Sequence, residues 1–145
     1  MALKHKFLKV STKNILPLLH IKSNLFQDKR IRYKNGDNIC WPNECEDADD
    51  ILLNIMSNLR DECVDIHDDI IRPILHDLER VDTLFGGFIP YSGLNYYGFT
   101  LFPTESIPTL ISVLTNVKTN SEIDAILDLC NKAIDKKQYI LHCGI

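Results

Sequence analysis

A long stretch of helical periodicity fills the middle of this 145-residue chain. Apolar side chains recur there at steps of three and four residues, at Leu52, Ile55, Met56, Leu59, Cys63, Ile66, Ile70, Ile74, Leu78 and Val81. Such spacing places the apolar side chains on one face of a helix. Pro73 lacks a backbone donor, so the helix should kink or break near residues 70–72. The sequence therefore predicts one long kinked helix, or two in line, opened by the acidic tract at residues 44–50.

The flanking segments predict short strands and helices. Residues 7–10 favour a strand followed by a short helix to Leu19, and Asn35-Gly36 is typical of the turn of a hairpin over residues 30–41. After Gly86-Gly87, an aromatic loop leads to a strand at 96–102, helices from about 104 and 121, and a final strand at 138–143. This order predicts an α+β fold in a single domain, residues 1–145. We expect a small antiparallel or mixed sheet covered by helices.

Charge is sorted along the chain. Residues 1–34 carry nine Lys or Arg and one acid, whereas residues 35–82 carry fourteen Asp or Glu and three Arg. A domain with this distribution has at least one strongly negative face, which attracts basic partners and repels nucleic acid and anionic membranes. The basic residues 29–34 beside Tyr33 would suit a nucleic-acid contact, but they would equally suit an internal pairing with the acidic segment. We therefore expect a basic protein partner, with no nucleic-acid or membrane partner.

The cysteine pattern and the N-terminal residues bear on localisation. Five cysteines are scattered without a Cys-x-x-Cys pair or a zinc-finger spacing. Lysine interrupts each short apolar run of the first ten residues, unlike a signal peptide, and no run approaches the length of a transmembrane helix. These features predict a cytoplasmic protein with reduced cysteines and no cofactor.

The best candidate for catalytic chemistry is the acidic cluster at residues 61–69 with His76. Asp65, Asp69 and His76 have helical spacing that would suit a divalent metal, so a metal-dependent hydrolase is the alternative function. The apolar stripe lies on the opposite face, however, and no second cluster completes a coordination shell. His142 and Cys143 would face opposite sides of a strand, which separates the one adjacent His–Cys pair. We therefore predict a protein that is not an enzyme and that has no catalytic or metal-binding residues.

The predicted partner-binding residues are acids along the wet face of the long helix and nearby tyrosines. Tyrosine buries a large area at little entropic cost, which suits an interface anchor. The set consists of Glu46, Asp47, Asp49, Asp50, Asp61, Asp65, Asp68, Asp69, Tyr91, Tyr96 and Tyr97.

The run from Gly93 to Pro103, GLNYYGFTLFP, and the C-terminal run from Tyr139 to Ile145, YILHCGI, resemble small bacterial immunity proteins. The family serves polymorphic-toxin and contact-dependent growth inhibition systems, and the likeness covers roughly the last third of the chain. It implies a protein that binds one cognate toxin domain in the cytoplasm, a basic nuclease, and blocks its active site or a nearby surface. It implies no catalytic residues. A regulatory adaptor for another basic protein fits the same charge pattern.

Overall fold

The computed structural model describes residues 3–15, 43–86, 89–118 and 120–145, with the backbone alone for residues 43–49. One six-stranded sheet runs through it in the order β2-β1-β6-β5-β3-β4, and every neighbouring pair is antiparallel. The predicted α+β class and antiparallel sheet are confirmed. The strands are β1 (Lys4–Val10), β2 (Val64–His67), β3 (Asp82–Phe85), β4 (Ile89–Ser92), β5 (Phe99–Phe102) and β6 (Tyr139–Cys143).

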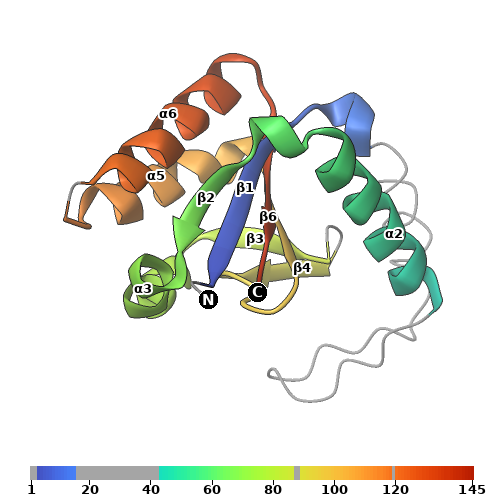
Figure 1. Cartoon of the computed structure of the whole chain (residues 1–145), viewed down its shortest axis with the longest axis horizontal. Helices are drawn as coiled ribbons and strands as arrows, with labels where there is room; N and C mark the ends of the chain where they lie inside the picture. Colours follow the sequence, from blue (N-terminus) through green and yellow to red (C-terminus); the bar gives the residue numbers. More distant parts are fainter. Residues whose placement is uncertain (1–2, 16–42, 87–88, 119) are drawn as a thin grey trace.

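Helices lie on both faces of the sheet (Figure 1). On one face α5 (Ile107–Thr115) and α6 (Ser121–Asp135) pack on the strands, and on the other lies α2 (Asn43–Asn58). Strand side chains alternate between two apolar cores, so that Phe7 faces α6 while the next residue, Leu8, faces α2. The result is a three-layer arrangement with the central strands β1 and β6 buried on both sides.

The two helices predicted after residue 104 are confirmed. The short turn η3 (Thr104–Ser106) leads into α5, and Pro108 lies in the first turn, where no intrahelical donor is needed. Asn120 caps α6, because its side-chain oxygen accepts a hydrogen bond from the backbone N–H of Ile123 at 2.9 Å. The buried stripe of α6 includes Ile126 and Cys130, which face the sheet.

The predicted long kinked acidic helix is not found. Helix α2 ends at Asn58, and η1 (Arg60–Glu62), β2, α3 (Asp68–Ile71), η2 (Arg72–Ile74) and α4 (Leu75–Leu78) follow. Val64 and Ile66 still face the core, because a step of two along a strand turns both side chains to one side. Both residues are β-branched, and β2 satisfies the outer backbone groups of β1. The pairing of β2 with β1 therefore overrides the helical periodicity of the apolar residues.

Sequence analysis does not predict the β3–β4 hairpin. Gly86 follows β3 with a φ of 62°, a conformation that glycine adopts without strain. The hairpin predicted at residues 30–41 lies outside the described residues, and of the short helix predicted up to Leu19 the structure describes a helical segment at residues 12–15. Among the described helices, none combines the length and the apolar composition needed to cross a membrane.

Candidate functional site

A cluster of polar side chains lies in the interior, on the sheet face that carries α5 and α6. His5, Thr100 and His142 are each 0% exposed, and Asp68 is 4% exposed. Two side chains reach the carboxylate of Asp68 from less buried positions. The buried polar cluster, as we name it, consists of His5, Asp68, Arg72, Tyr96, Thr100 and His142.

Strand register brings the centre of this cluster together. His142 of β6 is paired with Thr100 of β5 on one side and with Phe7 of β1 on the other. His5 points to the same face as Phe7, so it lies diagonally across from His142. Helix α3 begins with Asp68 directly after β2, the strand that pairs with β1. The carboxylate therefore arrives beside His5.

The cluster forms a continuous chain of hydrogen bonds. Thr100 Oγ1 accepts from the backbone N–H of Asn95 at 2.8 Å and lies 3.2 Å from His142 Nδ1. His142 Nε2 lies 2.8 Å from His5 Nδ1. His5 Nε2 lies 3.1 Å from Asp68 Oδ1. Each ring nitrogen of the two histidines therefore has a partner.

The chain has one consistent direction when both rings are neutral. The Tyr96 hydroxyl and Arg72 each donate to Asp68 at 2.5 Å, so the carboxylate is ionised and only accepts. His5 must then donate from Nε2 and accept at Nδ1. The donor at the contact between the two rings is therefore Nε2 of His142, and its Nδ1 accepts from the threonine hydroxyl. We assign both tautomers on this ground.

The pKa shifts of these side chains agree with this assignment of protons. Burial holds the pKa of His142 well below its usual value, and the neighbouring His5 adds to the effect. The hydrogen bond from Tyr96, with those from His5 and Arg72, lowers the pKa of Asp68 although burial opposes it. The same bond to Asp68 raises the pKa of Tyr96, so the phenol keeps its proton. Asp68 and Arg72 thus form the cluster's ion pair beside a neutral His142.

The geometry makes this cluster a structural element. Thr100 and both histidines are closed to solvent, and each of their side-chain nitrogens and oxygens already has a partner. No lone pair there is free to take a proton from a substrate. The bonds to Asp68 and Tyr96 fasten α3 and the 93–98 loop to the sheet. Fully satisfied interior networks of this kind favour one unique packing.

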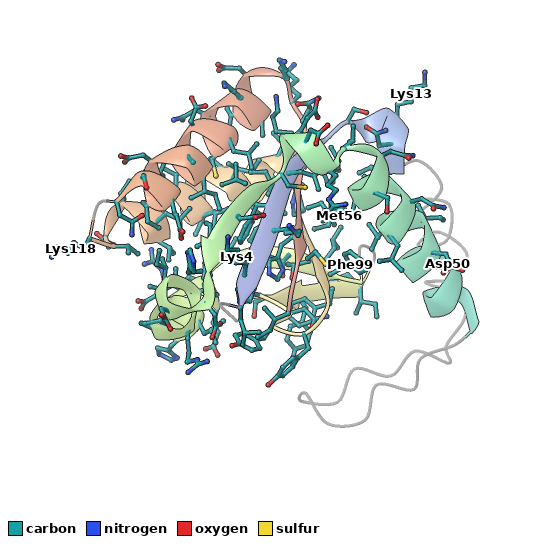
Figure 2. All side chains as sticks on the ribbon, in the orientation of Figure 1. Lys4, Lys13, Asp50, Met56, Phe99 and Lys118 are labelled. Carbon is teal, nitrogen blue, oxygen red and sulfur yellow. The ribbon has the colours of Figure 1, made fainter. Side chains whose placement is uncertain are left out.

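The structure distributes the predicted binding acids over separate places. Asp50 on α2, Asp61 on η1 and Asp69 on α3 are exposed. Since η1 precedes β2 and α3 follows it, Asp61 and Asp69 lie at opposite ends of that strand (Figure 1). Asp50 projects from α2, on the other side of the sheet from α6 (Figure 2). The side chains of the remaining predicted acids of α2, Glu46, Asp47 and Asp49, lie outside the described residues.

Two of the predicted binding acids have internal partners, which corrects the sequence interpretation. Asp65 lies in β2 opposite Lys6 of β1, and their charged groups are 3.1 Å apart. Asp68 belongs to the buried polar cluster and is closed to a partner. Sequence analysis places both on the wet face of a helix. Because residues 64–67 form a strand, Asp65 lies beside Lys6 of the neighbouring strand, and Asp68, directly after it, points into the interior.

The residues of the alternative metal site are not gathered. Asp65 is paired with Lys6, and His76 has a 92% exposed side chain that lies 3.3 Å from Glu79. Asp69 is exposed on α3. Within the described part of the chain, no three His, Cys, Asp or Glu side chains lie close enough to hold a metal ion.

The three predicted tyrosines differ in accessibility. Tyr97 is 80% exposed, with its ring edge-on to that of Tyr96 at a centroid distance of 4.8 Å. The Tyr96 hydroxyl already donates a hydrogen bond to Asp68. Tyr91 is 37% exposed and packs on Phe85, with ring centroids 4.4 Å apart. Tyr97 is therefore the most accessible aromatic anchor of the three.

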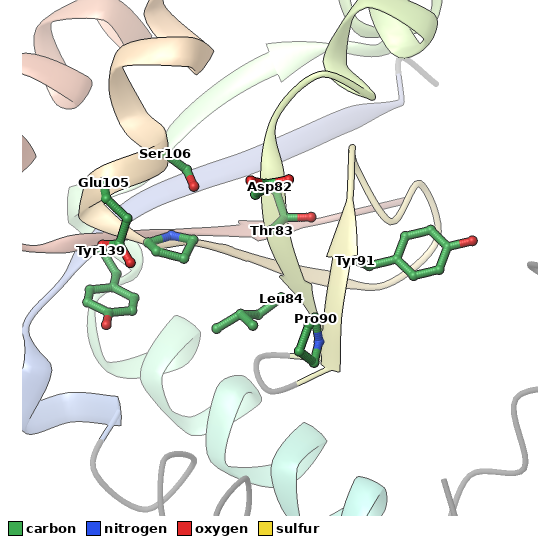
Figure 3. A pocket seen from close by; sticks show the side chains of 9 residues that line it. Asp82, Thr83, Leu84, Pro90, Tyr91, Glu105, Ser106 and Tyr139 are labelled. Carbon is green, nitrogen blue, oxygen red and sulfur yellow. The ribbon is translucent and has the colours of Figure 1, made fainter. Parts of the chain in front are cut away.

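A surface hollow of about 520 Å³ lies where β3, β4, η3 and the start of β6 meet (Figure 3). Asp82 from β3 and Glu105 from η3 are exposed acids on its walls, and none of the described residues that line it is basic. Burial raises the pKa of Tyr139, and the negative charge of Glu105 adds to the effect. The apolar part of the walls includes Leu84 and Pro90.

Sequence reasoning misses most of these residues. It considers His142 only beside Cys143, where it rejects a catalytic pair, and it assigns no role to His5 or Thr100. The alternation Lys4-His5-Lys6-Phe7 does signal a histidine on the apolar face of a strand. Its partner, however, lies 137 residues away, and only the pairing of β1 with β6 brings the two together. Among the residues that line the hollow, sequence analysis assigns a binding role to Tyr91 alone, since Asp82 and Glu105 belong to no motif.

An antiparallel sheet with helices on both faces supports many unrelated functions, so function must be argued from side chains. The described side chains offer a closed polar cluster, exposed acids and an acidic hollow. The likeness to immunity proteins stays a prediction. The chain matches no protein-family model, no curated protein and no solved structure.

Proposed function

We propose that this chain is an immunity protein that binds and neutralises a basic toxin domain, a nuclease, in the cytoplasm. The observation that carries the proposal is the surplus of exposed carboxylates between residues 50 and 82. Seven acids of this segment are exposed against three exposed arginines, and one of those, Arg72, is already held by Asp68. The exposed acids are Asp50, Asp61, Glu62, Asp69, Asp77, Glu79 and Asp82.

Carboxylates on a surface suit a partner that normally binds phosphate. A nuclease carries Lys and Arg where it holds the nucleic-acid backbone, and that positive surface attracts an acidic protein over a distance of about a Debye length. Electrostatic steering of this kind raises association rates by about 10 to 1,000-fold. A fast inhibitor protects the cell that carries it, because toxin that is captured on encounter has little time to act.

The buried polar cluster supports such a role by holding part of the acidic surface rigid. Asp69 directly follows Asp68, whose carboxylate is fixed by Tyr96 and His5. Arg72 closes the same turn of chain with its own bond to Asp68. A surface that is ordered before binding loses less entropy on docking.

The test is co-expression with the C-terminal domain encoded by the neighbouring open reading frame. We expect that domain to be basic, to arrest growth when expressed alone, and to lose its toxicity when this chain is present. An inactive variant of the same domain should co-purify with the chain as a defined complex. A toxic domain that still arrests growth in the presence of the folded chain would contradict the proposal.

The same experiment separates inhibition from simple binding. A regulatory adaptor would form the complex and leave the nuclease active in a purified assay with a labelled nucleic acid. An immunity protein should abolish cleavage at an equimolar ratio. Complex formation without inhibition would therefore overturn the immunity role.

A further inference from the structure

The hollow between β3 and η3 has the charge and the wall chemistry of a receptor for a cation. Asp82 and Glu105 approach it from separate elements, and each carries an exposed carboxylate. In Figure 3, Glu105 lies on one side with Ser106, and Asp82 projects from β3 opposite them. No described basic residue on the walls neutralises the two acids. A negative ligand would meet repulsion there, and a positive one would not.

Apart from Thr83 and Ser106, the remaining lining of the hollow consists of proline, leucine and tyrosine side chains. Leu84 and Pro90 lie side by side below Asp82 in Figure 3, and the Tyr139 ring lies below Glu105. A ring and aliphatic walls suit the faces of a planar cation, with the carboxylates at its edge. The ring of Tyr91 points away from this group in the same view, so it contributes to the rim rather than to the floor.

We propose that the hollow receives an arginine side chain of the basic protein partner. This inference rests on the proposed function for the identity of that partner. A guanidinium group is planar, is more weakly hydrated than an ammonium, and donates in two directions at once, which matches two carboxylates beside an aromatic wall. The docking of one arginine would also place the partner next to Glu79, whose backbone lies against Gly93 at the end of the same hairpin.

A protein side chain fits this hollow better than a free small cation. The hollow is a depression in the surface rather than an enclosed cavity. A free molecule bound there would lose translational and rotational freedom for a limited buried area. An arginine that belongs to a larger interface shares that entropic cost with the other contacts.

Three probes test the inference on the full chain by amide chemical-shift mapping. They are a blocked peptide of six arginines, the same peptide with citrulline at every position, and arginine amide. We expect the arginine peptide to shift the amides of Leu84, Glu105 and Tyr139 in a saturable way. The citrulline peptide, which keeps the shape and loses the charge, should leave them unchanged. Arginine amide should bind at least about tenfold more weakly than the peptide.

Charge-neutral variants supply the matched control. The double variant Asp82→Asn/Glu105→Gln should bind the arginine peptide about fivefold or more weakly than the wild type. The double variant Asp124→Asn/Asp135→Asn removes two exposed acids of α6 and should weaken this binding less than twofold. Glu105→Gln alone serves as a second variant, with far-ultraviolet circular dichroism to verify the fold of each protein.

Each outcome decides the inference. Shifts spread evenly over the acidic surface, or equal losses in both double variants, would overturn the specific role of the hollow. Binding of arginine amide as tight as that of the peptide would overturn the protein side chain as its occupant in favour of a small cationic ligand. Rescue of growth by the Asp82→Asn/Glu105→Gln variant at wild-type strength would contradict the hollow and leave the immunity role intact. Failed rescue by the wild-type chain with intact peptide binding would contradict the immunity role alone.

Discussion

His142 Nε2 lies 2.8 Å from His5 Nδ1 in an interior where both side chains are 0% exposed. Their rings are stacked, with centroids 5.1 Å apart and an interplanar angle of 21°. One nitrogen must donate and the other must accept, so the contact tolerates one proton. A second proton between the two nitrogens would set one N–H donor against another and leave neither with an acceptor.

The protein should therefore lose stability as the pH falls below the usual pKa of histidine. The folded pKa of His142 lies well below the usual value of 6.5, so the unfolded chain binds more protons as the pH falls below that value. The stability that this residue contributes is present above about pH 6.5 and is lost as the pH drops toward the folded pKa, with a slope of up to about 1.4 kcal/mol per pH unit. Urea unfolding between about pH 8 and pH 5 measures that slope.

Variants at two histidines test whether His142 causes the acid sensitivity. His142→Asn removes the titrating group, so its stability should fall less steeply with pH even if it is lower at every pH. His76→Asn changes a histidine whose side chain is 92% exposed and should keep the wild-type slope. An unchanged slope in His142→Asn would show that the acid sensitivity comes from elsewhere in the chain.

The hydroxyl of Thr100 is the far end of the same hydrogen-bond chain. Thr100→Val keeps the shape of the side chain but leaves the Asn95 N–H and His142 Nδ1 without a partner. An unsatisfied buried polar group costs about 1–3 kcal/mol, so we expect a loss of at least that size in the free energy of unfolding. Thr100→Ser keeps the hydroxyl and should lose less. Equal losses in the two variants, measured by urea unfolding, would contradict the role of the hydroxyl.

The fold could be predicted in outline because local signals agree with it at the C-terminal end. Pro108 and the Asn120 cap mark the starts of α5 and α6, and the apolar stripe of α6 faces the sheet as its spacing requires. The middle of the chain misleads because Ile66 fits the helical steps from Cys63 to Ile70 and also the strand step from Val64. The pairing of β2 with β1 settles that choice, and sequence spacing alone carries no information about it.

The candidate site shows the same division between local and distant information. Exposure of Asp61 and Asp69 follows from charge and is found in the structure. The burial of Asp68 depends on His5 and Tyr96, which lie 63 and 28 residues away in sequence. Polar residues in a core depend on partners brought by the whole topology, so a reading of one segment assigns them to the surface.

Gly144 lies where the last residues of the chain pass the 93–98 loop. A Cβ atom at this position would be 2.1 Å from the backbone oxygen of Tyr96. Gly144→Ala should therefore break the bonds from Gly144 N to Gly98 O and from Ile145 N to Tyr96 O, at a cost of about 2 kcal/mol. Hydrogen exchange of the amides of residues 144 and 145 should become faster.

Gly98→Ala is the matched comparison. Its new Cβ atom would meet the side-chain nitrogen of Asn95 at 2.5 Å, and a side chain can rotate away where a backbone carbonyl cannot. We expect a smaller loss of stability than in Gly144→Ala. The opposite order would show that the C-terminal residues do not hold the loop.

The three described free cysteines should differ in reactivity toward alkylating reagents. Cys130 is fully buried, and burial raises its pKa to about 12. The thiolate is the reactive form, so iodoacetamide at about pH 8 should modify Cys63 and Cys143, which are partly exposed, at least about tenfold faster. Peptide mass spectrometry against time gives the three rates. Concentrated guanidinium chloride should make them similar, and fast modification of Cys130 in the native protein would contradict its burial.

Exposed acids that steer association should act on its rate and on its salt dependence. The triple variant Asp50→Asn/Asp61→Asn/Asp69→Asn should slow association with the toxin domain about tenfold at low salt, and its rate should depend less on salt than that of the wild type. Dissociation should change little, because exposed charges contribute mainly to the encounter. Stopped-flow mixing over a series of sodium chloride concentrations separates the two rates.

A control with the same net charge distinguishes a local surface from overall charge. Helix α6 covers the opposite face of the sheet from α2. The control variant replaces three exposed acids of this helix, Asp124→Asn/Asp128→Asn/Asp135→Asn. If steering comes from the acids of the 50–82 segment, this variant should associate at close to the wild-type rate. Equal slowing of both triple variants would mean that net charge alone drives the encounter. The partner-binding surface would then have to be sought at other residues, beginning with Tyr97 and the hollow around Glu105.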